Sequence, residues 1–389
     1  MECYMAAIGV NTNFDGGSIE VVDISNPFKL VFSLRNDTNS KFKQWFYFQL
    51  NNLNTVKNDS VSMEDLTLTM TITGLKDSAY PDGWNNYNVC MSYDNKHWCR
   101  VASDFDGDNL TFNLKPTANS VYFAYFEPYS YARHLGLVGV ANNTVGVSHK
   151  ILGQTHQGRN VDLLVVGDEL AQNKIWIIAR QHPGETMTEW VMEGLIHKLL
   201  DRQDSISKTL LKDSVFYLVP NMNPDGAYMG NLRVNTQGVN LNREWLLPSL
   251  ERSPEVYWVQ KEMKKTGVDM FFDVHGDEAI PYVFTAGCQE NASYSNKQAQ
   301  LAEKFTHYLE LVNPDYQNVF GYEKGHFSNE ASSLATNWVG NEFDCLSFTI
   351  ELPFKDNANL PDIIHGWNGR RSYLFGQSIL IAINLVIRG

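Results

Sequence analysis

Residues 174–200 read KIWIIARQHPGETMTEWVMEGLIHKLL, and this stretch decides the fold of the larger part of the chain. It opens with a nearly continuous apolar run, which is typical of a strand buried on both faces of a sheet. Pro183-Gly184 then predicts a sharp turn. After the turn, apolar residues recur at helical spacing over 191–200, and Thr186 with Glu189 matches a capping box. A strand, a turn and a helix in this order indicate an α/β domain.

The same alternation of apolar runs and amphipathic segments continues to the C-terminus. Helices are expected at 186–201, 296–312 and 372–387. The expected strands are 161–167, 174–180, 214–220, 268–274 and 346–352. Alternating elements of this kind predict a mixed, mostly parallel sheet, in which functional residues gather at the carboxyl ends of the strands.

Residues 1–128 show a different pattern and are predicted to form a separate N-terminal domain. Short alternating runs such as 28–34 and 120–126 are separated by turns rich in Asn, Asp and Gly. This pattern is typical of an all-β antiparallel sandwich. We therefore expect an N-terminal β-sandwich domain over 1–128 and an α/β domain over 129–389.

The composition restricts the partners and the compartment. The formal net charge is −13, and an acidic surface argues against nucleic acid or an anionic membrane, because both attract clustered Lys and Arg. The N-terminus lacks the basic and apolar regions of a signal peptide, and no stretch approaches the ~20 apolar residues of a membrane span. Five cysteines without a C-x-x-C pair fit a reducing compartment. A cytoplasmic protein is expected, with a homo-oligomer left open.

Two predicted strand ends present histidine beside acidic residues. His182 and Glu185 follow the strand 174–180 directly, and His275 follows the strand 268–274. A catalytic zinc ion takes three protein ligands and keeps one position open, and two histidines with one glutamate are a recurrent set. Each residue alone could belong to an ordinary polar loop. Their occurrence at two strand ends favours a metal site.

Metal-assisted hydrolysis also needs a carboxylate that takes a proton from water. Glu351 ends another apolar strand, where a carboxylate is costly unless it is paired or functional; exposure at the sheet edge is the alternative. Arg233, Asn242 and Arg243 lie in a Gly- and Asn-rich segment. An arginine fork suits a carboxylate or a polarised carbonyl, although a surface salt bridge would also explain these arginines.

Together these motifs resemble a zinc carboxypeptidase and, more narrowly, a bacterial member of the cytosolic carboxypeptidase subfamily. The matching motifs are H-P-G-E at 182–185, N-P-D-G at 223–226, G-x-N-L-N-R-x-W at 238–245, D-V-H-G at 273–276 and the glutamate at 351. Residues 13–23, 35–53 and 122–135 are similar to the subfamily's N-terminal domain and its junction with the enzyme domain. The resemblance therefore covers nearly the whole chain.

The resemblance implies a zinc-dependent metallocarboxypeptidase with one zinc ion per chain. Such an enzyme hydrolyses the C-terminal peptide bond of peptides or proteins, with water activated by zinc and a glutamate base. The implied roles are zinc binding for His182, Glu185 and His275, activation of the water for Glu351, polarisation of the scissile carbonyl for Arg233, and binding of the substrate's terminal carboxylate for Asn242 and Arg243.

The chain departs from the family pattern at three places. Asn240 stands where the family commonly has an aspartate that hydrogen-bonds a zinc histidine, and an amide can accept that bond but lacks the charge. Phe348 replaces a tyrosine of the eukaryotic relatives, so Tyr322 becomes the candidate for the phenol that closes over the substrate. The pocket arginine of glutamate-trimming relatives is missing near Leu334, so a preference for acidic C-termini is not implied.

Two other functions stay open at this level. A zinc amidohydrolase of small N-acyl amino acids shares the histidine and glutamate set, although the Asn242-Arg243 pair and the N-terminal domain argue against it. A catalytically weak protein that binds C-termini is the other alternative. The presence of every ligand and of the base argues against that function.

Overall fold

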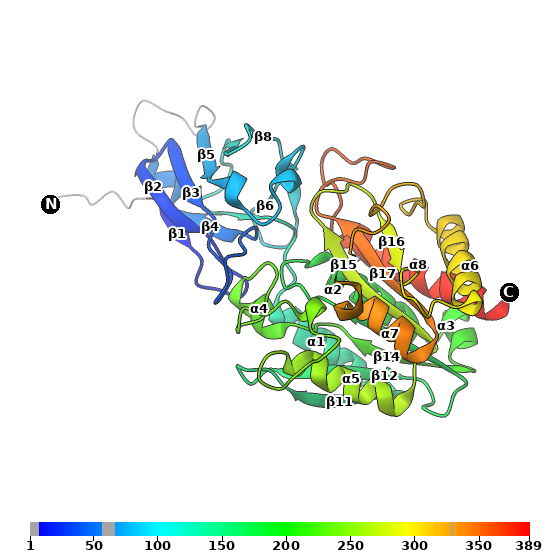
Figure 1. Ribbon diagram of the computed structural model, residues 1–389. Coiled ribbons are helices and arrows are strands. Elements are labelled where there is room, and N and C mark those ends of the chain that lie inside the picture. Colours follow the sequence, from blue (N-terminus) through cyan, green and yellow to red (C-terminus); the bar gives the residue numbers. More distant parts are fainter. Residues whose placement is uncertain (1–7, 57–66, 328–329) are drawn as a thin grey trace.

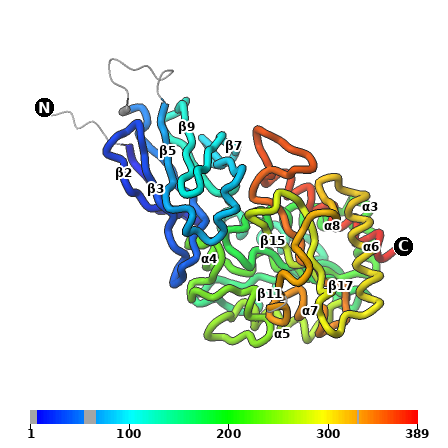
Figure 2. The backbone as a smooth tube through the Cα atoms, turned by 45° about the horizontal axis from the view of Figure 1, so that its top comes forward, coloured from blue at the N-terminus to red at the C-terminus, as the bar shows by residue number. Residues whose placement is uncertain are grey.

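The computed structural model describes residues 8–56, 67–327 and 330–389. The N-terminal strands form one lobe and the rest of the chain forms a larger one, and the two lie against each other in both views (Figures 1 and 2). Aromatic packing joins them, since the rings of Tyr125 and Phe354 are 4.7 Å apart. One hydrophobic cluster contains buried residues of both lobes. The lobes are thus joined by a shared core as well as by the chain.

The N-terminal lobe consists of two five-stranded sheets. The first has the strand order β1 (Gly9–Asn11), β4 (Tyr47–Asn51), β10 (Val121–Ala124), β6 (Val89–Ser92) and β7 (Cys99–Val101). The second has the order β2 (Glu20–Asn26), β3 (Lys29–Ser33), β5 (Leu68–Thr73), β9 (Leu110–Leu114) and β8 (Ser103–Phe105). Short 3-10 helices are η1 (Leu53–Val56), η2 (Leu75–Asp77) and η3 (Pro81–Trp84).

Side-chain burial alternates along the strands of these sheets, as the period-2 pattern of the sequence predicts. In β5 every second residue is fully buried, because successive side chains of a strand point to opposite faces. Rings of the two sheets meet, with Phe32 of β3 4.9 Å from Phe48 of β4. The expected antiparallel pairing holds except between β3 and β5, which are parallel. The chain passes through β4 of the other sheet before it returns as β5, so β5 is free to enter in the direction of β3.

A seven-stranded mixed sheet is the centre of the larger lobe. Its order is β11 (Val147–Gln154), β12 (Asn160–Val166), β14 (Ser214–Val219), β13 (Asn173–Ala179), β15 (Met270–Asp277), β17 (Leu346–Pro353) and β16 (Phe284–Gly287). The central strands β14, β13, β15 and β17 are parallel, and the outer pairings are antiparallel. The mixed sheet expected from the sequence is therefore present, with its parallel strands in the middle.

Helices cover both faces of this sheet. They are α1 (Tyr131–Asn142), α2 (Met187–Leu200), α3 (Ser205–Leu210), α4 (Pro224–Met229), α5 (Pro254–Thr266), α6 (Asn296–Val312), α7 (Ala335–Phe343) and α8 (Gly369–Arg388), with the 3-10 turns η4 (Leu241–Arg243) and η5 (Ala331–Ser333). Along β13, Ile175 and Ile177 belong to the same hydrophobic cluster as residues of α2 and α8, whereas Trp176 and Ile178 belong to the cluster that contains residues of α5 and α7. Within the described ranges, no helix is long and apolar enough to cross a bilayer.

The capping box expected at the start of α2 is not formed. The Thr186 side chain makes no capping hydrogen bond and instead donates to the carbonyl oxygen of Glu127 at 2.8 Å. Glu189 is fully buried, where it contacts Nδ1 of His134 at 2.8 Å and forms an ion pair with Arg180. A buried charge needs such partners, so tertiary contacts replace the predicted local ones.

Candidate metal centre and active site

The predicted metal ligands meet at the carboxyl ends of two neighbouring strands. His182 and Glu185 lie on the turn between β13 and α2, and His275 lies near the end of β15, which pairs with β13. One ligand atom from each lies within 4.8 Å of the others, and all three residues are buried. Among the residues whose structure is described, this is the one group of His, Cys, Asp and Glu close enough to hold a metal ion.

The Glu185 carboxylate lies between the two imidazoles. Its Oε1 is 2.7 Å from Nδ1 of His182, and its Oε2 is 2.9 Å from Nδ1 of His275. Burial alone would raise the pKa of Glu185, but the imidazoles of His182 and His275 together outweigh this effect and lower the pKa to about 2. Two Nδ1 atoms and an ionised carboxylate thus converge on one spot, and zinc is a metal that favours this donor set.

The remaining nitrogen of each imidazole is held by a second polar side chain. Nε2 of His182 is 3.0 Å from Oδ1 of Asn240, the uncharged contact that the sequence suggested. Nε2 of His275 is 2.8 Å from Oδ2 of Asp273, which also accepts a hydrogen bond from Gln181 at 2.6 Å. Such contacts fix the ring orientation and direct Nδ1 toward a metal. Sequence reasoning missed Asp273; its signal was a charge inside an apolar strand.

The turn that carries His182 and Glu185 is fixed from both sides. Arg180 adopts a left-handed conformation with φ 59°, and its Nε donates to the carbonyl oxygen of Pro183 at 2.9 Å. The backbone N–H of Gly184 donates to the carbonyl oxygen of Leu232 at 2.8 Å. A Cβ at Gly184 would lie 3.0 Å from the backbone Cα of Leu232, so glycine suits this close approach of two backbone segments.

Glu351 lies beside the candidate metal ligands because His275 and Glu351 are direct partners in the β15–β17 register. Its Oε1 is 2.9 Å from the Tyr322 hydroxyl. Its Oε2 is buried and has no hydrogen-bond partner in the described part of the chain. Burial raises the pKa of Glu351 to about 8, with help from Glu185 and Asp277. A buried carboxylate oxygen without a donor calls for a cation or a water molecule as its partner, which fits a metal site here.

Tyr322, the candidate phenol, reaches the same place from a loop distant in sequence. Its hydroxyl lies 2.9 Å from Oε1 of Glu351 and 3.0 Å from Oδ2 of Asp277, and its ring stacks on His326 at 4.9 Å. Phe348, where the eukaryotic relatives carry tyrosine, is buried in the hydrophobic core. The Tyr322 hydroxyl therefore reaches the candidate site, whereas the Phe348 ring is part of the hydrophobic core.

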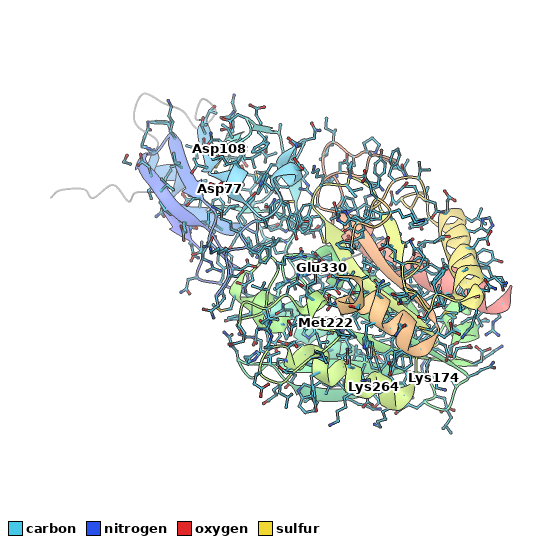
Figure 3. The ribbon with its side chains drawn as sticks, in the orientation of Figure 1. Asp77, Asp108, Lys174, Met222, Lys264 and Glu330 are labelled. Carbon is cyan, nitrogen blue, oxygen red and sulfur yellow. The ribbon has the colours of Figure 1, made fainter. Side chains whose placement is uncertain are left out.

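The predicted carboxylate-binding pair lies on η4. Arg243 forms an ion pair with Glu330, which Figure 3 labels in the middle of the molecule. Nδ2 of Asn242 is 3.3 Å from Nε2 of His275, and its Oδ1 accepts a hydrogen bond from the backbone of Ala335 at 2.9 Å. The Arg243 guanidinium therefore already holds a carboxylate, next in sequence to the asparagine that contacts His275.

Arg233 lies on the segment that follows α4. Its guanidinium carbon is 5.6 Å from the ring centre of Phe42 and 5.5 Å from that of Tyr80, two residues of the N-terminal lobe. Its positive charge interacts with the carboxylate of Glu185. All seven predicted site residues thus lie in the region around the metal ligands. A candidate histidine–glutamate metal site, a buried carboxylate oxygen without a partner among the described residues and two arginines are the groups that a metal-dependent hydrolase uses.

Comparison with known proteins identifies the family. Residues 10–126 match the cytosolic carboxypeptidase N-terminal domain, and residues 140–370 match zinc carboxypeptidase. The chain belongs to the zinc carboxypeptidase family, in its cytosolic carboxypeptidase subfamily. It is a zinc-dependent carboxypeptidase, which confirms the function, enzyme class and cofactor predicted from the sequence.

The relatives include bacterial and animal proteins. A metallo-carboxypeptidase from Burkholderia cenocepacia is 42% identical, with a TM-score of 0.92 over 98% of this chain and 99% of its own. A metallo-carboxypeptidase from Pseudomonas aeruginosa, in complex with (2-guanidinoethylmercapto)succinic acid, is 43% identical, with a TM-score of 0.92 over 97% of this chain and 99% of its own. Cytosolic carboxypeptidase 6 of Caenorhabditis elegans is 26% identical over 88% of this chain and 78% of its own.

Proposed function

We propose that His182, Glu185 and His275 bind the zinc ion and that Glu351 is the general base of peptide hydrolysis. The observation that carries this proposal is the convergence of three ligand atoms within 4.8 Å beside a Glu351 oxygen that has no partner among the described residues. A zinc ion bound there supplies Lewis-acid chemistry, which makes water nucleophilic at neutral pH and polarises a carbonyl.

The protein's own groups then move the proton and hold the charge. Glu351 takes the proton of the attacking water and passes it to the nitrogen of the departing amino acid. The Tyr322 hydroxyl lies 2.9 Å from Oε1 of Glu351, so Oε2 is the oxygen left for this transfer. Arg233 stabilises the negative charge that develops on the carbonyl oxygen. The rings of Phe42 and Tyr80 lie 5.6 and 5.5 Å from its guanidinium carbon and hold the charge in a partly buried position, where its interactions are stronger than in water.

Arg243, with Asn242, gives the enzyme its preference for chain ends. We infer that the guanidinium binds the terminal carboxylate of a peptide or protein, and that the substrate displaces Glu330 from it. Two facts support this inference: Arg243 already pairs with a carboxylate, and the compound in the Pseudomonas aeruginosa relative is a dicarboxylic acid. Residues 330–340 contain no Arg or Lys, so the segment around Leu334 gives no reason to expect a preference for acidic C-terminal residues.

We also propose a domain boundary, a sandwich arrangement of the N-terminal sheets and a cellular compartment. The domain boundary lies at residues 128 and 129, just before α1 begins at Tyr131. The two N-terminal sheets form a sandwich, which the ring contacts between β3 and β4 support. The protein works in the cytoplasm, which the four free cysteines among the described residues and the animal cytosolic carboxypeptidases support.

Metal analysis combined with a peptide assay tests the proposal. We expect one zinc ion per chain in the parent and none in His182→Ala or His275→Ala. His97→Ala is the matched control, because the His97 side chain is 90% exposed and lies in the N-terminal lobe. Mass spectrometry of a C-terminal peptide library should show the release of single residues by the parent and the control. Retention of zinc by His275→Ala, or cleavage of N-acyl amino acids but not of peptides, would contradict the proposal.

A further inference from the structure

A carboxylate of the N-terminal lobe binds the backbone of the segment that carries Arg233. Asp37 lies on the loop between β3 and β4, and it is only 4% exposed. Its Oδ1 accepts a hydrogen bond from the backbone N–H of Leu232 at 2.7 Å. Its Oδ2 accepts from the N–H of Arg233 at 2.7 Å and from that of Val234 at 3.2 Å. One side chain thus fixes three consecutive backbone groups centred on Arg233.

The loop that carries Asp37 is itself held in place. The N–H of Asp37 donates to the carbonyl oxygen of Phe42 at 2.7 Å. Both the backbone N–H and the hydroxyl of Thr38 donate to Oδ1 of Asn231 at 3.0 Å, and Nδ2 of Asn39 donates to the carbonyl oxygen of Thr236 at 2.9 Å. Bonds on both sides of Asp37 therefore leave its carboxylate little freedom to shift. A carboxylate held rigidly in this way can in turn hold the backbone that it contacts.

The same lobe also positions the side chain of Arg233. The rings of Phe42 and Tyr80 lie 5.6 and 5.5 Å from its guanidinium carbon, within the range of a cation–π contact. Backbone and side chain of Arg233 thus both depend on residues from outside the α/β lobe. In Figures 1 and 2, α4, which precedes this segment, lies where the N-terminal lobe meets the larger lobe.

A further hydrogen bond connects this segment to the metal ligands. The carbonyl oxygen of Leu232 accepts from the N–H of Gly184 at 2.8 Å, and Gly184 lies between His182 and Glu185. The contacts therefore run from Asp37 through Leu232 to the turn that presents two ligands. The turn is also held by Nε of Arg180, which donates to the carbonyl oxygen of Pro183, so His182 and Glu185 do not depend on Asp37 alone.

We propose that Asp37 is a positioning residue, through which the N-terminal lobe holds Arg233 in the place where the carbonyl oxygen of the substrate becomes negative. The proposal rests on the role proposed above for Arg233. It assigns a function to the N-terminal lobe, which completes the active site. Loss of this contact lowers the turnover number, because stabilisation of a developing charge demands placement to within a fraction of an ångström.

The test uses the zinc-loaded, full-length protein and the variant Asp37→Asn. Asparagine keeps the size but replaces one acceptor oxygen with an NH₂ group that would face a backbone N–H, so at least one of the three hydrogen bonds is lost. We expect kcat for a peptide substrate to fall about 10- to 100-fold, with KM changed less than about threefold and one zinc per chain retained. Thr71→Val is the matched control, because it removes a hydroxyl contact of the N-terminal lobe, 3.3 Å from the Thr111 hydroxyl, that lies outside the loop of Asp37. It should keep kcat within about threefold.

A double-variant comparison separates positioning from a general loss of structure. Arg233→Ala alone should lower kcat about 10²- to 10³-fold, and Asp37→Asn added to it should lower kcat no further, because its effect acts through the missing guanidinium. The proposal would be overturned if Asp37→Asn lowered kcat in the Arg233→Ala background by as much as it does in the parent. Parental kcat in Asp37→Asn alone would also overturn it. Parental kcat in Arg233→Ala would instead contradict the role proposed for Arg233. If Asp37→Asn does not fold, Phe42→Leu replaces it, and its expected loss of about two- to fivefold must likewise vanish in the Arg233→Ala background.

Discussion

Replacement of Glu351 by glutamine tests the centre of the mechanism. Glutamine has the same shape, so no cavity forms in β17, and its side-chain oxygen can still accept from the Tyr322 hydroxyl, which lies 2.9 Å from Oε1 of Glu351. The change replaces only the free, buried Oε2 with an NH₂ group that cannot accept a proton. Removal of a general base costs about 10²- to 10⁴-fold in rate, which corresponds to about 2.7–5.4 kcal/mol of transition-state stabilisation.

The assay compares kcat, KM and zinc content of Glu351→Gln with those of the parent. We expect kcat to fall by the full factor, KM to stay within about threefold because substrate binding involves other residues, and zinc to stay at one per chain. Asp277→Asn is the control, because Asp277 is the other carboxylate that contacts the Tyr322 hydroxyl, at 3.0 Å, and carries no proposed proton transfer. Its kcat should fall less than about tenfold. Peptide hydrolysis by zinc-loaded Glu351→Gln at the parental rate would refute the assignment of the base.

Three further predictions follow from single contacts. Arg243→Ala should raise KM for peptides with a free C-terminus about 10- to 100-fold, since a charge-assisted pair is lost; an equal loss on C-terminally amidated peptides would contradict the anchoring role. Asn240→Asp places a carboxylate 3.0 Å from Nε2 of His182 and should tighten zinc binding about tenfold in a chelator competition, whereas unchanged affinity would show that charge at this position is unimportant. Burial raises the pKa of Glu255 from 4.5 to about 8, so stability from its neutral form is complete below pH 4.5 and is lost as the pH rises through 8. Between pH 6 and pH 9 the unfolding free energy of the parent should therefore fall about 3 kcal/mol more than that of Glu255→Gln. Denaturant titrations at both pH values measure these free energies, and an equal fall in the two proteins would refute this reasoning.

Much of the fold could be read from local patterns. The apolar run at 174–180 became β13, and the helical spacing after Pro183-Gly184 became α2, because burial on one or both faces imposes a periodicity on the residues themselves. The placement of the candidate ligands was predictable for a related reason, since strand ends are marked in the sequence and sites gather there. The capping box at Thr186 failed because a local motif competes with tertiary hydrogen bonds, which leave no periodic signal.

The sequence by itself determined the strands, the helices and the chemical identity of the candidate site. Only the tertiary structure decided that Glu351 stands next to His275 in the β15–β17 register, that Tyr322 closes on Glu351 from a separate loop, and that Asp37 binds the backbone of Arg233 across 196 residues. Local propensity acts between neighbours along the chain, whereas these contacts depend on how the sheets and loops pack in space. No spacing in the sequence encodes that packing.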